Sequence, residues 1–139
     1  MHIKLLHILI PFVVIPFAVL LPQGERTAAP HPPQIDILPK TMLLHVDSTG
    51  FLTATAKVLN RGGEPLVISK ITPSCGCATA KVAKNPTIPL DITPLHISIN
   101  TSTVTDSVMA VEFTIESNST GSPTVYRVQI HNPNALKKP

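Results

Sequence analysis

The two cysteines of this chain, Cys75 and Cys77, are separated only by Gly76. A bend brings the Cα atoms of residues i and i+2 to roughly 5.5–6.5 Å, within the range of a disulfide, and glycine lowers the backbone cost of that bend. Two thiolates on one bend can also bind Cu(I) or supply half of a zinc site. Thiol–disulfide exchange is a further possibility. The sequence around the cysteines has to decide among these chemistries.

A disulfide between Cys75 and Cys77 would close a very short loop, so it would remove little chain entropy from the unfolded state. It should therefore stabilise the fold only modestly, and the strain of so short a loop should make it easier to reduce than an ordinary structural disulfide. Export from the cytoplasm, which the apolar N-terminus predicts, favours the oxidised form. We expect a structural or redox-passive turn, and we keep thiol redox chemistry and Cu(I) binding by the same two residues as the alternative.

Other residues add little to the metal and redox interpretations. Zinc would need two more ligands, and four histidines lie beyond the apolar N-terminus: His31, His45, His96 and His131. None stands at a ligand-like spacing from the cysteines. A reactive thiol generally needs a helix N-terminus or a nearby cation, but no helix is predicted here, and Lys70 and Lys81 are near only in sequence. We expect no cofactor and, because no catalytic triad or carboxylate pair is indicated, no enzyme.

The chain that positions the cysteines consists of short strands and turns. Apolar and polar residues alternate in several segments: 52–58, 66–71, 95–99, 109–115 and 126–130, with one or two more strands in 35–38 and 42–46. Glycines in the turn 60–65 make the first two of these a hairpin candidate. About seven strands separated by turns predict an all-β, immunoglobulin-like antiparallel sandwich.

Aliphatic burial has to stabilise this sandwich, because neighbouring cysteines cannot form the inter-sheet disulfide of antibody domains. The alternation predicts the following inward-facing set: Leu52, Ala54, Ala56, Val58, Ile68, Ile71, Leu95, Ile97, Ile99, Val111, Phe113, Ile115, Tyr126, Val128 and Ile130. A segment of this length is about the size of a small β-sandwich with a single core.

An apolar segment covers residues 5–22, interrupted only by His7. It is near the lower limit for spanning a bilayer, and no well-placed small-residue cleavage site follows it. Residues 1–22 are therefore predicted to be a signal anchor, with a cleaved signal peptide as the alternative. Lys4 before the segment, and no lysine directly after it, favours an N-terminus that stays inside. Either interpretation places the rest of the chain outside the cytoplasm, anchored in the inner membrane or secreted to the periplasm.

The remaining chain divides by composition. Residues 23–34 are rich in proline and poor in apolar residues, which predicts an extended linker. The predicted sandwich covers residues 35–132, and a flexible tail covers 133–139. The net charge is +3, with acidic and basic residues mixed, and aromatic residues make up 4% of the chain. Nucleic-acid binding is therefore not expected.

Two motifs together resemble a known bacterial family. Asn60, Gly62, Pro65, Leu66 and Ile68 match an N-x-G-x-x-P-L-x-I turn, Ser74-Cys75-Gly76-Cys77 matches an S-C-G-C element, and Ser117-Asn118 matches a late S-N turn. Over roughly residues 51–130 the chain is similar to the family called domain of unknown function 1573.

The resemblance implies an exported immunoglobulin-like sandwich of the bacterial cell envelope and does not imply an enzyme. The expected partner is another envelope protein, bound through a sheet edge by β-strand addition or through the end loops, including the cysteine bend. The sequence departs from the family at Ala78, where threonine is usual. It also departs at Ile88-Pro89-Leu90, where glycine usually follows the proline. A different turn is therefore expected at Leu90.

Overall fold

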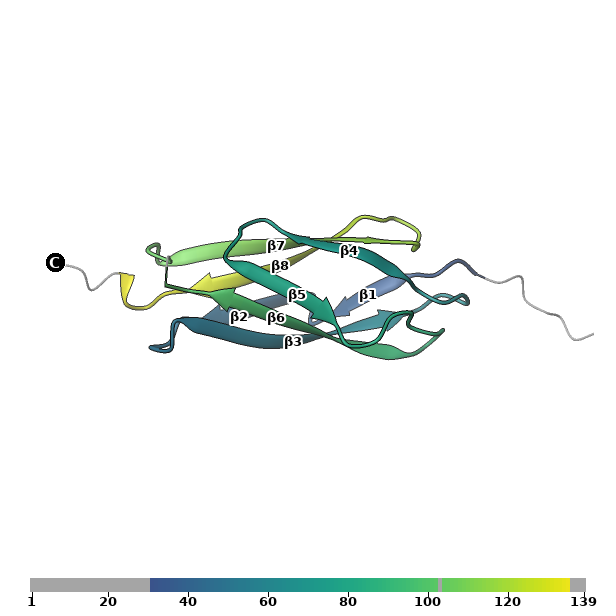
Figure 1. The fold of residues 1–139 in the computed structure, drawn as a ribbon, viewed down its shortest axis with the longest axis horizontal. Helices are drawn as coiled ribbons and strands as arrows, with labels where there is room; N and C mark the ends of the chain where they lie inside the picture. Colours follow the sequence, from purple (N-terminus) through teal and green to yellow (C-terminus); the bar gives the residue numbers. More distant parts are fainter. Residues whose placement is uncertain (1–30, 103, 136–139) are drawn as a thin grey trace, which may run out of the picture.

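The computed structural model of the protein describes residues 31–102 and 104–135 and shows a two-layered β-sandwich (Figure 1). Its strands are β1 (Ile35–Leu38), β2 (Thr41–His45), β3 (Phe51–Asn60), β4 (Ile68–Pro73), β5 (Ala78–Val82), β6 (Ile92–Asn100), β7 (Val108–Ser117) and β8 (Thr124–His131). Sheet A has the order β1-β3-β6-β5, and sheet B has the order β2-β8-β7-β4. The predicted all-β sandwich is confirmed.

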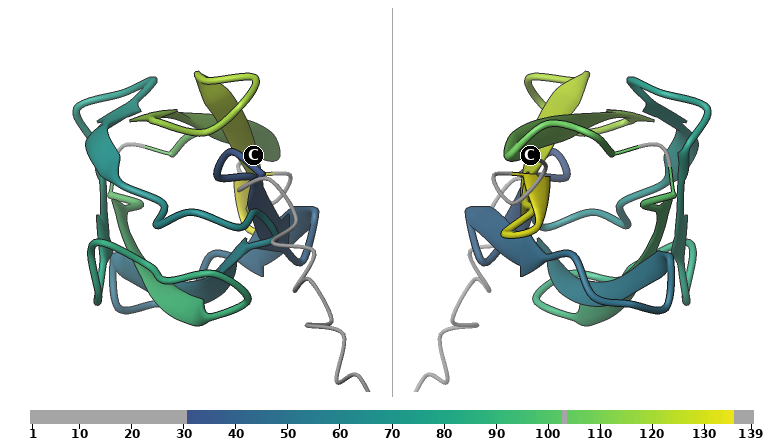
Figure 2. Two further views of the ribbon diagram at one scale, coloured as in Figure 1. Left: turned by 90° about the vertical axis from the view of Figure 1, so that its right-hand side faces the viewer. Right: turned by 90° about the vertical axis from the view of Figure 1, so that its left-hand side faces the viewer.

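The chain passes between the two sheets at several connections (Figure 2). β1 pairs with β3 in sheet A, whereas β2, which follows after two residues, pairs with β8 in sheet B. The β2–β8 pair is parallel, and the other strand pairs are antiparallel. The predicted antiparallel pairing therefore holds for every described pair except β2–β8, where the chain switches sheets between β1 and β2 instead of reversing.

The predicted hairpin between β3 and β4 is also wrong. β3 pairs with β1 and β6 in sheet A, while β4 pairs with β7 in sheet B. The glycine-containing segment between them crosses the end of the sandwich, and Leu66 within it is fully buried and forms an isolated bridge with Thr87. Burial of this leucine between the layers explains why the turn connects two sheets rather than two neighbouring strands.

The core matches the predicted inward-facing set except at two positions. Ala54 and Ile71 are half-buried, and the other residues of that set are buried. The core also includes Ile37, Leu66, Ala78 and Val104. Ala78 begins β5, a strand that the alternation did not predict, because alanine and lysine have low β-propensity and the strand is only five residues long.

The predicted anchor and most of the predicted linker lie outside the described residues. Within residues 31–102 and 104–135, no helix is long and apolar enough to cross a membrane. His31 to Gln34, the last part of the predicted linker, are described and pack against the sandwich. Pro33 is buried there, so the folded unit includes residues that the composition assigned to the spacer.

Candidate functional site

The cysteine bend connects β4 of sheet B to β5 of sheet A. Cys75 and Cys77 are joined by a disulfide, with their Cα atoms 5.2 Å apart. Before the bend, the Ser74 N–H donates to the Glu112 carbonyl at 2.8 Å, and the Glu112 N–H donates to the Ser74 hydroxyl at 3.0 Å. After it, the Asn100 N–H donates to the Cys77 carbonyl at 2.7 Å. The bend is therefore fixed to β7 on one side and to the end of β6 on the other.

The bonded sulfur pair lies between solvent and the core. Both cysteines are half-buried and pack against the core cluster, whereas Gly76 is exposed. A Cβ atom added at Gly76 would meet nothing within 4 Å, and Gly76 is not in the left-handed region. The bend therefore requires neither a left-handed φ nor the missing side chain of a glycine at position 76. Among the described residues, no group of three or more histidine, cysteine, aspartate or glutamate residues could hold a metal ion.

Asn60 organises the opposite end of β4. Its side chain is completely buried. Its Oδ1 accepts hydrogen bonds from the Gly62 N–H at 2.9 Å and the Gln34 N–H at 3.4 Å. Its Nδ2 donates to the Glu64 carbonyl at 2.7 Å and the Thr87 carbonyl at 3.0 Å. One amide side chain thus connects the end of β3, the crossing segment, the N-terminal segment and the loop before β6.

Gly62 allows the N-terminal segment to lie directly on this turn. The Arg61 N–H donates to the Gln34 carbonyl at 2.8 Å, and the Gly63 N–H donates to the His31 carbonyl at 2.9 Å. An ideal Cβ atom at Gly62 would lie 2.2 Å from the Pro32 carbonyl oxygen. Only glycine fits a contact this close between two stretches of backbone, which explains the glycine of the motif.

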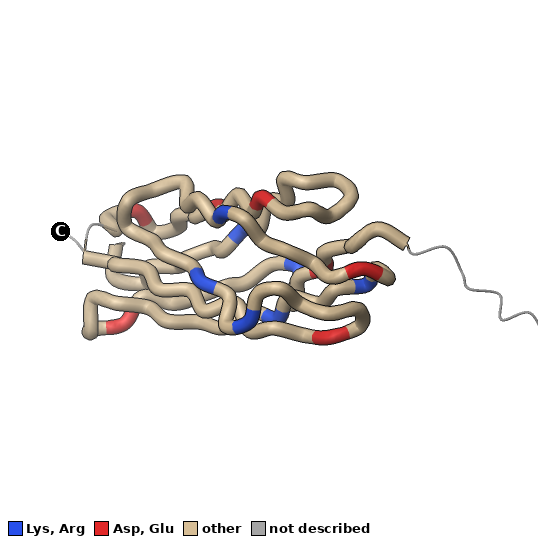
Figure 3. The backbone as a smooth tube through the Cα atoms, turned by 45° about the vertical axis from the view of Figure 1, so that its right-hand side comes forward, with Lys and Arg blue, Asp and Glu red and all other residues tan. Residues whose placement is uncertain are grey.

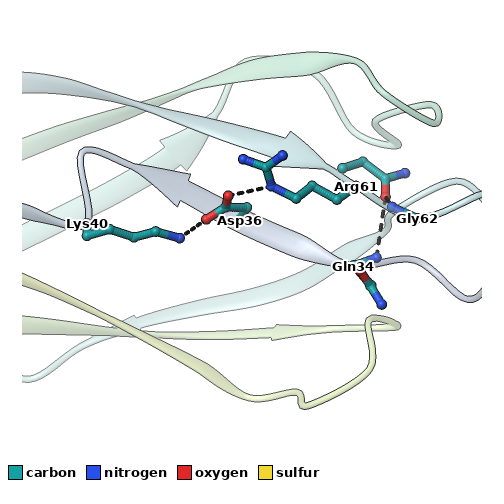
Figure 4. A network of polar contacts seen from close by, with 6 residues as sticks. Gln34, Asp36, Lys40, Arg61 and Gly62 are labelled. Carbon is teal, nitrogen blue, oxygen red and sulfur yellow. Dashed lines mark hydrogen bonds and ion pairs between the residues drawn. The ribbon is translucent and has the colours of Figure 1, made fainter.

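An ion-pair cluster lies beside this contact (Figure 4). Asp36 on β1 accepts from the Lys40 ammonium and, at 2.6 Å, from the Arg61 guanidinium. The hydrogen bonds from Lys40 and then Arg61 hold the pKa of the Asp36 carboxyl below its ordinary value. Both basic side chains are largely exposed, so the cluster orients the segment more than it stabilises the fold.

Two more asparagines fix the crossing segment. The Asn118 amide donates to the Pro65 carbonyl at 3.0 Å and accepts from the Val67 N–H at 2.8 Å. The Asn85 Oδ1 accepts from the Ile68 N–H at 3.0 Å, and the Asn85 Nδ2 donates to the Ile68 carbonyl at 2.7 Å. Asn118 belongs to the predicted motif, but Asn85 was missed. The Asn-Pro pair at 85–86 was an available signal, because asparagine before proline marks turns in which the side chain binds backbone.

Leu90 occupies the turn position at which the sequence departs from the expected glycine. Leu90 has a φ of 61°, the left-handed conformation that glycine adopts without strain. Its N–H donates to the Asn60 carbonyl at 2.8 Å, and the Asp91 N–H donates to the Ile88 carbonyl at 3.1 Å. The side chain is 78% exposed and therefore avoids a clash. The leucine itself thus takes the conformation for which the absent glycine would be favoured.

A shallow hollow of about 860 Å³ lies on the outer face of sheet A. Strand register aligns its polar lining in two rows: Thr53, Ser98 and Thr79 in one, and Thr55, His96 and Lys81 in the other. The hollow therefore presents hydroxyl groups, one lysine and one histidine beside the open edge of β5. Outside the hollow, the described residues carry charges of both signs over the length of the sandwich (Figure 3).

The cysteine bend and the Asn60 turn lie at opposite ends of β4, so the motif residues do not form one site. Asn60, Gly62 and Ser74 serve the packing of loops against the sandwich. Pro65 is exposed, and its carbonyl accepts from Asn118. Gly76 in the bend, and Thr79 and Lys81 on β5, which follows it, are exposed.

The two packed sheets and the strand order define an immunoglobulin-like β-sandwich. The chain belongs to the family described as protein of unknown function (DUF1573), which matches residues 40–131. This match confirms the resemblance drawn from the two motifs.

Several solved structures share the fold. A protein of unknown function from Porphyromonas gingivalis W83 has a TM-score of 0.63 at 16% identity, over 79% of this chain and 50% of that chain. The YadV chaperone has a TM-score of 0.52 at 14% identity, over 71% of this chain and 51% of that chain. The secreted serine protease VesC from Vibrio cholerae has a TM-score of 0.53 at 11% identity, over 71% of this chain and 23% of that chain.

At these identities the likeness shows the fold alone. The chain spans about half or less of each of these structures. No curated protein matches it.

Proposed function

We propose that this protein is a non-catalytic binding module of the bacterial cell envelope, exported and held at the membrane by residues 5–22. Its binding surface is the edge of sheet A at β5. The apolar N-terminal segment supports export. The observation that carries the binding proposal is the open β5 edge beside the hollow on sheet A.

Strand order supports this choice of edge. Among the described strands, β5 pairs with β6 and has no second neighbour. The edge of β4 is less suitable, because Asn85 occupies both backbone groups of Ile68 and a register shift interrupts pairing after that residue. An exposed edge strand can accept an extended segment from another chain through main-chain hydrogen bonds.

The hollow supplies a means of selecting that segment. Side chains of an added strand would alternate between the two faces of the sheet. Those on the outer face would lie beside Thr79 and Lys81, which border the hollow. Hydroxyl groups and one lysine suit a segment with polar or acidic side chains at alternate positions. The proposed partner is therefore an envelope protein that presents an extended strand of this kind.

Site-specific cross-linking in cells tests the proposal. A photoreactive side chain replaces Thr79 on β5 in the full chain, and a matched variant carries it at Gln129, which is exposed on the central strand β8 of sheet B. We expect a protein adduct from position 79 only, in a membrane fraction that resists carbonate and is released by detergent. The amides of β5 should also gain protection from hydrogen exchange when the partner is added. Equal adducts from both positions, or none from position 79, would contradict the proposal.

The alternative is a thiol redox or Cu(I)-handling domain that uses Cys75 and Cys77. Their partial exposure favours it, whereas their packing against the core favours a structural bond.

The double variant Cys75→Ser/Cys77→Ser distinguishes the two functions. Closing a loop this short should contribute about 1–2 kcal/mol through chain entropy. We expect urea unfolding to show a loss of that size, and the cross-link from position 79 to persist. A variant that keeps its stability but loses the cross-link would instead place the sulfur pair in the functional site.

A further inference from the structure

Two histidines that are distant in sequence meet at one corner of sheet B. His45 ends β2 and His131 ends β8, and the parallel register of these strands places them opposite each other. Their Nδ1 atoms are 3.4 Å apart. The ring centroids are 5.4 Å apart, and the rings are nearly perpendicular, at 88°.

This geometry suits two ligands of one metal ion. Two nitrogens at a Zn–N distance of about 2.0–2.1 Å and a tetrahedral angle lie roughly 3.4 Å apart. Adjacent ligands in a square-planar site would be nearer, at about 2.9 Å. As a direct hydrogen bond, a separation of 3.4 Å is long, since such bonds are mostly about 2.7–3.2 Å. The separation is therefore that of two ligands of one tetrahedral ion, and it is at the long end of the hydrogen bond that the two rings make with each other.

The backbone holds the two histidine residues side by side before any ion arrives. The Val46 N–H donates to the His131 carbonyl at 2.9 Å, directly beyond the paired histidines. His45 is exposed and His131 is half-buried, so the site can be reached from solvent. Neutral imidazole is a good ligand for zinc and for neighbouring transition metals.

We propose that His45 and His131 bind one divalent transition-metal ion, best Zn²⁺, and leave two coordination positions open. Among the described residues, no third histidine, cysteine or carboxylate completes a ligand group. The open positions are therefore filled by water or by a donor from a ligand outside this chain. The site lies on the β2 edge of sheet B, away from β5 on sheet A, so it does not depend on the proposed binding edge.

Zinc titration of the full chain in detergent, followed by isothermal calorimetry, tests this site. Loss of a group that only supports a metal ligand weakens metal affinity by roughly 10-fold to 100-fold. Loss of a ligand itself should cost at least as much, so His45→Gln and His131→Gln should each weaken the zinc affinity of this site by that factor or more. The matched control is His96→Gln, because His96 is an exposed histidine on sheet A whose ring nitrogen contacts the Thr55 hydroxyl. It should leave the affinity unchanged.

Cobalt supplies a second measurement, because tetrahedral Co²⁺ absorbs visible light far more strongly than octahedral Co²⁺. We expect the strong bands in the wild-type chain and in His96→Gln, and not in the other two variants. Thermal unfolding without metal checks that each variant is folded. Zinc binding that is equal in all four proteins, or absent in the wild type, would overturn the proposal.

Discussion

Replacing Asn60 by alanine should lower the free energy of unfolding by about 3–5 kcal/mol, a large share of the stability of a domain of this size. The substitution removes an amide that is completely buried. It leaves the Gly62 N–H without a partner in a buried setting, and it removes one of the two hydrogen bonds of the Thr87 carbonyl, which the Leu66 N–H still binds at 2.9 Å. The unsatisfied N–H costs about 1–3 kcal/mol, and each of the other hydrogen bonds lost from the Asn60 amide costs about 0.5–1.5 kcal/mol. Urea unfolding of the variant, with the slope of the transition compared, measures the loss.

Asn118→Ala is the matched control for this measurement. Asn118 also binds two backbone groups of the crossing segment, but it is exposed, so water can replace its hydrogen bonds. We expect a loss of only about 1 kcal/mol. Equal losses in the two variants would show that the backbone around Asn60 relaxes to find other partners, and that the buried amide is not the organising residue of this end.

The strands and core could be predicted because their signal is local. Alternation along β3, β6, β7 and β8 identified the residues that face the core, since side chains on a strand alternate between its faces. Pairing between distant strands could not be obtained in this way. The turn after Asn60 has the composition of a hairpin turn, but β3 pairs with β6 and β4 pairs with β7, so the chain crosses to the other sheet and buries Leu66 on the way.

The candidate site was predictable in its parts but not in its arrangement. The motif residues Asn60 and Ser74 were identified, yet they lie at opposite ends of β4 and support different loops. His45 and His131 were considered only as partners of the cysteines, because no sequence spacing indicates that the parallel pairing of β2 and β8 brings them together. Asn85 was missed because it lies in the loop before β6, whereas its partner is the backbone of Ile68 at the start of β4.

Gly62→Ala should lower the free energy of unfolding by about 2–4 kcal/mol, because the added methyl group cannot fit. Its Cβ atom would lie 2.2 Å from the Pro32 carbonyl oxygen, 2.6 Å from the Pro33 Cα and 2.8 Å from the Gln34 nitrogen. These are backbone atoms, so the N-terminal segment as a whole has to move. Its bonds to Arg61, Gly63 and Thr120 would then be lost, at about 0.5–1.5 kcal/mol each.

Hydrogen exchange at three amides locates the effect. The N–H groups of Arg61, Gly63 and Thr120 are bonded to the carbonyls of Gln34, His31 and Pro33, and they should exchange much faster in Gly62→Ala. Gly76→Ala is the matched control, since the space around Gly76 is open and its φ is not left-handed. Its stability should stay within about 0.5 kcal/mol of the wild type.

The outcome also bears on how the domain is held at the membrane. The segment from His31 to Gln34 is the part of the described chain next to the proposed anchor, and its contacts with the Asn60 turn fix the direction in which the chain leaves the sandwich. If Gly62→Ala releases the segment, the cross-link from β5 should weaken in cells although the edge itself is unchanged. Rapid exchange at the three amides without any loss of that cross-link would mean that the anchor does not orient the binding edge.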